Sequence, residues 1–148
     1  MRMCGRYYLN VTDKLLKVIH CFFNEMRSLH GEIETVEIMP GNTAPVYVMR
    51  GGACIAEKMK WGFNVKNGSL VINARCETLY ERIMYSNICN TQRCVIPASG
   101  YYEWRRGDGQ KFSFSSATNE LMYLCGIYRY FEDEAQFVVV TRSASDGV

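Results

Sequence analysis

A cysteine near the start of the chain, in Met3-Cys4-Gly5-Arg6-Tyr7, has unusual chemical potential. Removal of the residues before Cys4 would leave a thiol and an α-amine on one residue. Ordinary pKa values are about 8.5 for a thiol and about 7.7–8.0 for an α-amine, so both are partly nucleophilic at neutral pH. Such a residue condenses with an aldehyde, because the amine forms a Schiff base and the thiol closes a five-membered thiazolidine ring. The alternative is that Cys4 is a small buried residue that starts a strand.

A second group of polar residues stands at the junction of a short apolar strand and a predicted helix. Asn73, Arg75 and Glu77 lie within residues 72–78, where backbone donors and side chains converge. This crowding indicates a site for a polar ligand. A simple helix start, with Glu77 placed favourably against the helix dipole, explains the same residues.

Residues 94–104 combine an acid with an aromatic strand. A strand over residues 100–105 puts Tyr102 and Trp104 on one face and Glu103 on the other. An acid inside such a strand is costly to bury unless it is paired or exchanges protons. Glu103 is therefore a candidate proton donor or acceptor, and a solvent-facing edge position is the alternative. A fourth segment, residues 39–45, is a rigid loop that lines a groove or connects two elements.

Two helices are predicted to flank these segments. Thr12 or Asp13 can cap the first, whose apolar residues recur at spacings of three and four and which ends before His30-Gly31. Its apolar face is best explained as core, and His20 beside it as a structural residue. The second helix is predicted from about residue 78 to residue 88.

Strand patterns dominate the remainder of the chain. Gly51-Gly52 is a two-residue hairpin signal between strands at 46–50 and 53–61. Further strands are predicted at residues 71–73, 94–97, 100–105, 111–115, 121–128 and 136–141. These elements predict an α+β domain with mostly antiparallel, barrel-like β-sheets and a few flanking helices. Residues 142–148 resemble a turn that leads onward, so we expect a single domain over residues 3–148 that is truncated at its C-terminus.

The composition narrows the class of protein. The 148 residues carry 17 Lys and Arg against 15 Asp and Glu, and a formal net charge of +2 limits nucleic-acid binding to a local basic cluster. The seven cysteines, an odd number at irregular spacing, argue against a disulfide framework and a secreted protein. We expect a protein of a reducing compartment, without a membrane span, a structural metal site or an organic cofactor.

Taken together, these segments resemble the SRAP family, named for SOS-response-associated peptidases. The resemblance spans about residues 3 to 141 and follows the family's order of motifs. The matching segments are Met3-Cys4-Gly5-Arg6-Tyr7, Asn42-Thr43-Ala44-Pro45, Trp61-Gly62, residues 73–78, residues 94–104, Cys125-Gly126-Ile127-Tyr128 and residues 137–141.

The resemblance implies a protein that recognises abasic sites in single-stranded DNA and bonds covalently to the ring-opened sugar aldehyde. In this role Cys4 would be the nucleophile, Asn73 would orient the amine or the sugar, and Glu103 would move protons. The implied DNA contacts are Arg6 and Arg75 at phosphates, Trp104 in support or stacking, Pro45 and Met84 as an apolar wedge, and Asn42. The implied protein is a monomer that uses no metal or cofactor and acts in a bacterial cytoplasm and nucleoid or in a eukaryotic nucleus.

Departures from the family leave other functions open. Met1-Arg2-Met3 precedes Cys4, which becomes N-terminal only if translation starts at Met3 or the leader is removed. The family's histidine belongs to a segment beyond Val148, and neither His20 nor His30 matches it. A cysteine-type peptidase that acts on its own leader is the second hypothesis, and a non-catalytic DNA-binding module is the third.

Overall fold

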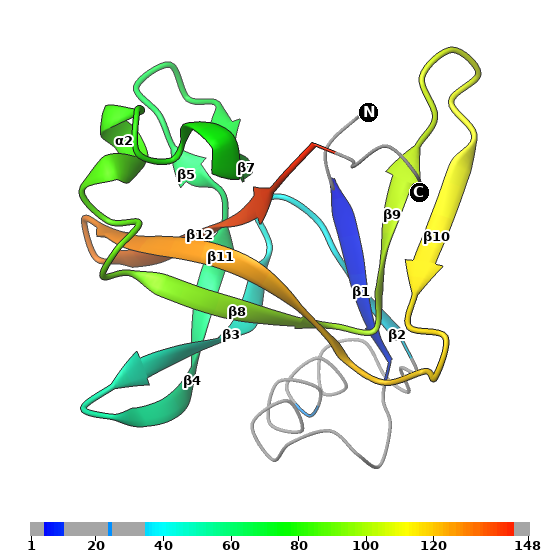
Figure 1. The fold of residues 1–148 in the computed structure, drawn as a ribbon, viewed down its shortest axis with the longest axis horizontal. Coiled ribbons are helices and arrows are strands. Elements are labelled where there is room, and N and C mark those ends of the chain that lie inside the picture. The colour runs from blue at the N-terminus through cyan, green and yellow to red at the C-terminus, as the bar shows by residue number, and fades with distance from the viewer. Residues whose placement is uncertain (1–4, 11–23, 25–34, 144–148) are drawn as a thin grey trace.

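The computed structural model describes residues 5–10, 24 and 35–143 of the chain. Cys4 and, apart from residue 24, the first predicted helix lie outside these described residues. What the structure describes is a four-stranded sheet and a closed barrel that share one main hydrophobic core (Figure 1).

The four-stranded sheet is antiparallel and has the order β10-β9-β1-β2. Its strands are β1 (Arg6–Asn10), β2 (Thr35–Ile38), β9 (Gly100–Trp104) and β10 (Lys111–Ser115). Successive side chains of a strand point to opposite faces of a sheet. Tyr7 and Leu9 are buried at the inner face, so Arg6 and Tyr8 belong to the outer face.

Five strands close into a barrel in the order β11-β8-β3-β4-β12, because β12 pairs again with β11. They are β3 (Thr43–Arg50), β4 (Ala53–Trp61), β8 (Arg93–Ala98), β11 (Met122–Phe131) and β12 (Glu134–Thr141). A short strand, β7 (Asn73–Arg75), extends the barrel by parallel pairing with β12. A small ribbon beside it consists of β5 (Phe63–Asn64) and β6 (Leu70–Val71).

Trp61 joins the barrel to the four-stranded sheet. It is fully buried, and its ring centroid lies 5.3 Å from that of Tyr7 on β1. On its other side it stacks on Phe137 of β12, with centroids 6.2 Å apart. Its indole Nε1 donates a hydrogen bond of 2.9 Å to the carbonyl of Ile72, directly before β7. One side chain therefore sets the relative positions of β1, β12 and β7.

The chain passes from the barrel into the four-stranded sheet at Ser99, between β8 and β9 (Figure 1). The Ser99 backbone N–H donates to the carbonyl of Tyr8 at 2.8 Å, and its hydroxyl oxygen accepts from the backbone N–H of Asn10 at 2.9 Å. These bonds fix the start of β9 against β1.

The predicted hairpin at Gly51-Gly52 is confirmed. Arg50 of β3 pairs with Ala53 of β4, and the two glycines have φ angles of 55° and 81°. Positive φ at both central residues is the requirement of a type I′ turn, which glycine meets without steric cost.

The predicted α+β class with a few flanking helices is wrong, because the described chain is mostly β. The helical elements of the described chain are a 3-10 turn, η1 (Cys76–Thr78), and the four-residue α2 (Ile83–Ser86). The helix predicted over residues 78–88 breaks at Arg82, whose backbone is extended with φ −87° and ψ 121°. Tertiary packing outweighs the helical pattern, since Tyr85 packs on Phe63 and donates a hydrogen bond to the carbonyl of Asn73. No described helix is long and apolar enough to cross a membrane.

Gly126 of β11 lies where the barrel leaves no room for a side chain. A Cβ there would be 2.6 Å from Cδ1 of Ile96, 2.8 Å from Sγ of Cys94 and 3.0 Å from the carbonyl oxygen of Val138. We expect Gly126→Ala to lower the free energy of unfolding, measured by urea titration, by about 1–3 kcal/mol through overpacking. Ile96→Val removes the atom nearest to this Cβ, so the double variant should lose less free energy of unfolding than the sum of the losses of the two single variants. Strict additivity of the two losses would contradict this explanation.

Candidate functional site

Glu103 lies on the inner face of the four-stranded sheet, beside the amino end of β1. It follows Tyr102, the partner of Arg6, and shares its face with Tyr101, which packs against the main core. Its carboxyl oxygen Oε2 is buried and has no hydrogen-bond partner among the described residues. Burial raises the pKa of the Glu103 carboxyl, because the charged form loses its hydration. The edge position considered as the alternative does not apply, and the side chain is suited to give and take a proton.

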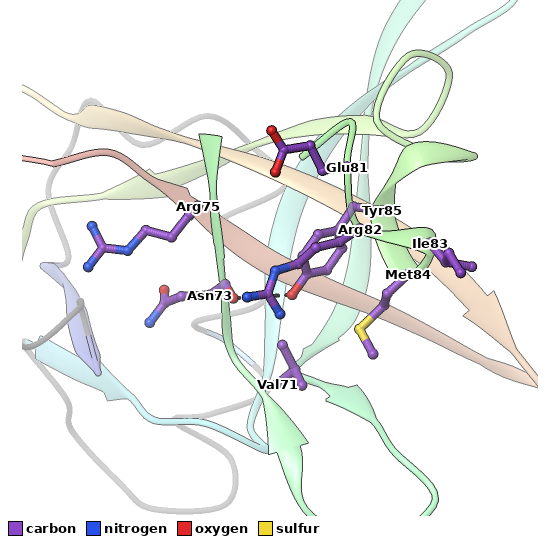
Figure 2. Close-up of a pocket in the computed structure, with 8 residues that line it drawn as sticks. All are labelled: Val71, Asn73, Arg75, Glu81, Arg82, Ile83, Met84 and Tyr85. Carbon is purple, nitrogen blue, oxygen red and sulfur yellow. Dashed lines mark hydrogen bonds between the residues drawn. The ribbon is translucent and has the colours of Figure 1, made fainter. Parts of the chain in front are cut away.

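Asn73 and Arg75 lie on one face of β7. The parallel pairing sets Asn73 beside Val139 and Arg75 beside Thr141 of β12. Val139 belongs to the main core that also holds Tyr7, so both site residues face the side of the barrel on which β1 packs. Figure 2 shows the two side chains projecting to the same side of the strand. The structure therefore brings Asn73, Arg75 and the inner face of β1 together.

An open pocket of about 490 Å³ lies between β7 and α2. Its lining residues are Val71, Asn73, Arg75, Glu81, Arg82, Ile83, Met84 and Tyr85 (Figure 2). The lining includes two guanidinium groups and one carboxylate. Ile83 and Met84 expose 88% and 37% of their surfaces. Exposed apolar side chains beside guanidinium groups suit a ligand with both anionic and ring-shaped parts.

Sequence reasoning selected Met84 and missed its neighbours Arg82 and Ile83. A run of one basic and two apolar residues is ordinary on an amphipathic helix, so the residue types carried no special signal. Their exposure arises because the predicted helix breaks at Arg82.

Arg6 and Trp104 lie on the outer face of the four-stranded sheet, opposite to Glu103. Arg6 Nη1 is 2.9 Å from a carboxylate oxygen of Glu37, and its guanidinium carbon is 5.6 Å from the centroid of the Trp104 ring. The prediction that Tyr102 and Trp104 share a face is confirmed, with ring centroids 6.4 Å apart. Arg6 therefore lies on the outer side of the four-stranded sheet, whereas Arg75, on β7 of the barrel, faces its inner side.

Asn42 lies in the connection between β2 and β3, and Pro45 lies near the start of β3. The Asn42 side-chain oxygen accepts from the backbone N–H of Met39, and its carbonyl accepts from the backbone N–H of Trp61, both at 2.9 Å. Pro45 is buried within β3, opposite Lys58. Neither residue lines the pocket at β7 that contains Met84.

Two of the described cysteines, Cys94 and Cys76, are not activated nucleophiles. Burial raises the pKa of the Cys94 thiol to about 12. Partial desolvation, followed by the carboxylate of Glu77, also raises the pKa of the Cys76 thiol. Within the described residues no group of His, Cys, Asp and Glu is arranged to hold a metal ion. Cys4, the candidate nucleophile, lies outside them.

The family model for SOS response associated peptidases (SRAP) matches residues 3–148. The chain belongs to the SRAP family. The resemblance that rested on the motifs of the sequence is thereby confirmed.

Two relatives of this SRAP chain illustrate its place in the family. It is 33% identical over 116 residues to the abasic site processing protein YMR114C of Saccharomyces cerevisiae, covering 70% of this chain and 31% of that protein. It is 29% identical over 113 residues to the abasic site processing protein YobE of Bacillus subtilis, covering 72% of this chain and 51% of that protein. The SRAP chain thus spans about half the length of the bacterial relative and less of the yeast one.

Two solved structures share the fold. A phage-related protein of Bordetella bronchiseptica aligns with a TM-score of 0.67 at 20% identity, over 94% of this chain and 69% of that one. A protein of Bacteroides thetaiotaomicron aligns with a TM-score of 0.65 at 18% identity, over 93% of this chain and 68% of that one.

Glu77, which follows β7, holds in place the chain that leaves the end of β12. Its Oε1 accepts a hydrogen bond of 2.8 Å from the backbone N–H of Ser143. This bond holds the pKa of the Glu77 carboxyl below its ordinary value. Because Glu77 follows Arg75 by two residues, the bond supports the parallel pairing that orients Arg75.

The raised pKa of Glu103 predicts a pH-dependent stability. The folded chain binds this proton more tightly than the unfolded chain, so its contribution is full below the ordinary value of 4.5 and is lost as the pH rises through the raised folded pKa. Glu103→Gln cannot ionise, so we expect it to be more stable than the parent at neutral pH, with the difference shrinking toward pH 4. Urea unfolding at several pH values measures this. Asp133→Asn, in the exposed β11–β12 turn, is the control, and a pH-independent difference for Glu103→Gln would contradict the prediction.

Proposed function

We propose that this SRAP protein processes abasic sites in DNA and bonds covalently to the ring-opened sugar through Cys4. The observation that carries the proposal is a buried carboxyl oxygen of Glu103 beside the amino end of β1, which has no hydrogen-bond partner among the described residues, with Asn73 and Arg75 on the same side. The names of the yeast and Bacillus relatives, both abasic site processing proteins, support the substrate.

Chain geometry supports the choice of nucleophile. Cys4 precedes Arg6 by two residues, a link that spans at most about 7 Å. Arg6 pairs with Tyr102, the residue before Glu103. A short link therefore joins Cys4 to the end of β1 that lies beside Glu103, which favours it as the nucleophile that uses this carboxyl.

The proposed reaction balances with the loss of one water. The Cys4 amine adds to the sugar aldehyde, and the resulting carbinolamine loses its hydroxyl as water to give an imine. Protonated Glu103 donates the proton that this departure requires. The nitrogen keeps its hydrogen in this step, so the imine forms in its protonated state. The thiol sulfur then adds to the imine carbon, the thiol proton passes to the Glu103 carboxylate, and the ring nitrogen is left as a neutral secondary amine. Asn73 supplies an amide that orients the amine or the sugar.

The pocket at β7 supplies the proposed contacts to the DNA strand. The guanidinium groups of Arg75 and Arg82 suit phosphates, because a planar fork of donors matches phosphate oxygens. The exposed Ile83 and Met84 suit unstacked bases. On the outer face Arg6 and Trp104 extend these contacts. A local cation cluster of this kind compensates for a net charge of only +2.

Loss of the Cys4 thiol should abolish the adduct. We expect the chain begun at Met3, incubated with single-stranded DNA that contains an abasic site, to gain the mass of the DNA minus one water in a product that survives denaturation. Cys4→Ser should give no thiazolidine, whereas Cys76→Ser, which removes an exposed thiol of the site motif, should react like the parent. Intact-mass spectrometry and denaturing gels measure both.

The chain begun at Met1 tests the requirement for a free amine. If its leader is retained, it should form no thiazolidine although the thiol is present. A normal adduct from a chain whose leader is intact, or no adduct from a chain that starts with Cys4, would refute the mechanism.

Removal of its own leader is the second candidate function, favoured by the description of the family as peptidases. Glu103 is the described group best suited to assist it. We expect purified protein begun at Met1 to lose residues 1–3, and Glu103→Gln to retain them. Residues 1–3 retained in both proteins, or lost from both, would argue against this activity and leave the crosslinking proposal standing.

A further inference from the structure

A single carboxylate, that of Glu37 on β2, pairs with cations from two other strands on the outer face of the four-stranded sheet. Its Oε2 is 2.9 Å from Nη1 of Arg6 on β1, and its Oε1 is 3.6 Å from Nζ of Lys111 on β10. The sheet has the order β10-β9-β1-β2, so the side chains of Lys111 and Glu37 meet above the two strands between them. Arg6, Glu37 and Lys111 are here named the carboxylate bridge.

Two aromatic rings of β9 lie under the cations of the carboxylate bridge. Nζ of Lys111 is 3.6 Å from the centroid of the Tyr102 ring, and the guanidinium carbon of Arg6 is 5.6 Å from that of Trp104. Partial burial raises the pKa of the Tyr102 hydroxyl, and the negative charge of Glu37 raises this pKa further. The three charges of the carboxylate bridge therefore act within one small area of the surface, and they sum to one net positive charge.

Stability is a poor explanation for the carboxylate bridge. The side chains of Arg6, Glu37 and Lys111 expose 33%, 39% and 40% of their surfaces, and ion pairs as open to water as these contribute little to the free energy of unfolding. The neighbours of Glu37 on β2, Val36 and Ile38, are buried in the main core and hold the strand in place. What the carboxylate does change is the charge that this surface presents, because it occupies both cations with an anion.

We infer that Glu37 competes with DNA phosphate for Arg6 and Lys111 and thereby lowers the reversible affinity of the protein for a DNA strand. A carboxylate and a phosphate accept hydrogen bonds from the same guanidinium donors, so a phosphate gains the paired donor of Arg6 only by displacing Glu37. Undamaged DNA, held by reversible contacts alone, is then released readily, whereas a strand bonded to Cys4 is kept by its covalent bond. The inference rests on the proposed function, in which Arg6 contacts the DNA strand.

Removal of the Glu37 charge tests the inference on undamaged DNA, without the covalent reaction. The probe is a fluorescent oligothymidylate of about 12 nucleotides, titrated with the full chain at several KCl concentrations and followed by anisotropy. Glu37→Gln should bind about fivefold more tightly at about 0.1 M KCl, and its slope of log affinity against log salt should be steeper by about 0.7, the contribution of one phosphate contact. This slope would not change for a residue that only supports the fold.

Glu57→Gln is the matched control. Glu57 lies on β4 of the barrel and is likewise paired with an arginine, Arg50, at 2.9 Å. Its substitution raises the net charge by the same amount, and we expect the affinity and salt slope of the parent, because salt screens distant charges. In a Lys111→Ala background, Glu37→Gln should gain less affinity, because one of the two cations that it releases is absent. Thermal unfolding checks that each variant is folded, and Glu37→Thr, a neutral residue that suits a strand, is the second test variant.

The outcomes separate this inference from the proposed function. Unchanged affinity and salt slope in Glu37→Gln, an equal gain in Glu57→Gln, or no binding of oligothymidylate by either the parent or Glu37→Gln would overturn the role of Glu37. Such a result would leave intact an adduct at Cys4, which is measured on abasic DNA. Conversely, tighter binding by Glu37→Gln together with no adduct on abasic DNA would retain the role of Glu37 and reject the crosslinking reaction.

Discussion

The burial of Trp61 between Tyr7 and Phe137 is the contact on which the rest of the structure depends. It holds the four-stranded sheet against the barrel, and through its hydrogen bond to Ile72 it also positions β7. Glu103 is positioned by the pairing of β9 with β1, and Asn73 and Arg75 are positioned by the pairing of β7 with β12. This indole, at the centre of the core that the two sheets share, helps to bring these groups to one side of the molecule.

Glu103 carries a buried carboxyl oxygen without a hydrogen-bond partner among the described residues, and Tyr47, Thr78 and Gln92 carry buried neutral oxygens of the same kind. Gln136 is fully buried, yet its side-chain oxygen accepts hydrogen bonds from the backbone N–H of Asn64 and from Arg129, and its amide donates to Glu134. Buried polar groups are ordinarily paired in this way, because an unpaired one loses hydration without compensation. A carboxyl oxygen that finds no partner in the described part of the chain therefore costs stability, and proton transfer during the proposed reaction gives a physical reason for it.

Much of the local structure could be predicted from residue types. The Gly51-Gly52 turn follows from the φ angles that glycine permits, and the division of Tyr102 and Glu103 between two faces follows from strand alternation. The helix over residues 78–88 could not be judged in the same way. Its apolar spacing fits a helix, but packing of Tyr85 on Phe63, two residues of different elements, decides the backbone at Arg82.

The sequence by itself determined which reactive residues are available: a cysteine near the start, an acid in an aromatic strand, and Asn73 and Arg75 at the junction of a strand and a predicted helix. Only the structure places Asn73 and Arg75 together on a short strand. The sequence also determined the family, because motifs are local and keep their order. Only the tertiary structure decided that Arg6 pairs with Tyr102, far along the chain, and that Arg6 and Glu103 face opposite sides of one sheet. Such pairings depend on burial of rings such as Trp61 by several distant strands at once, and no local pattern encodes that geometry.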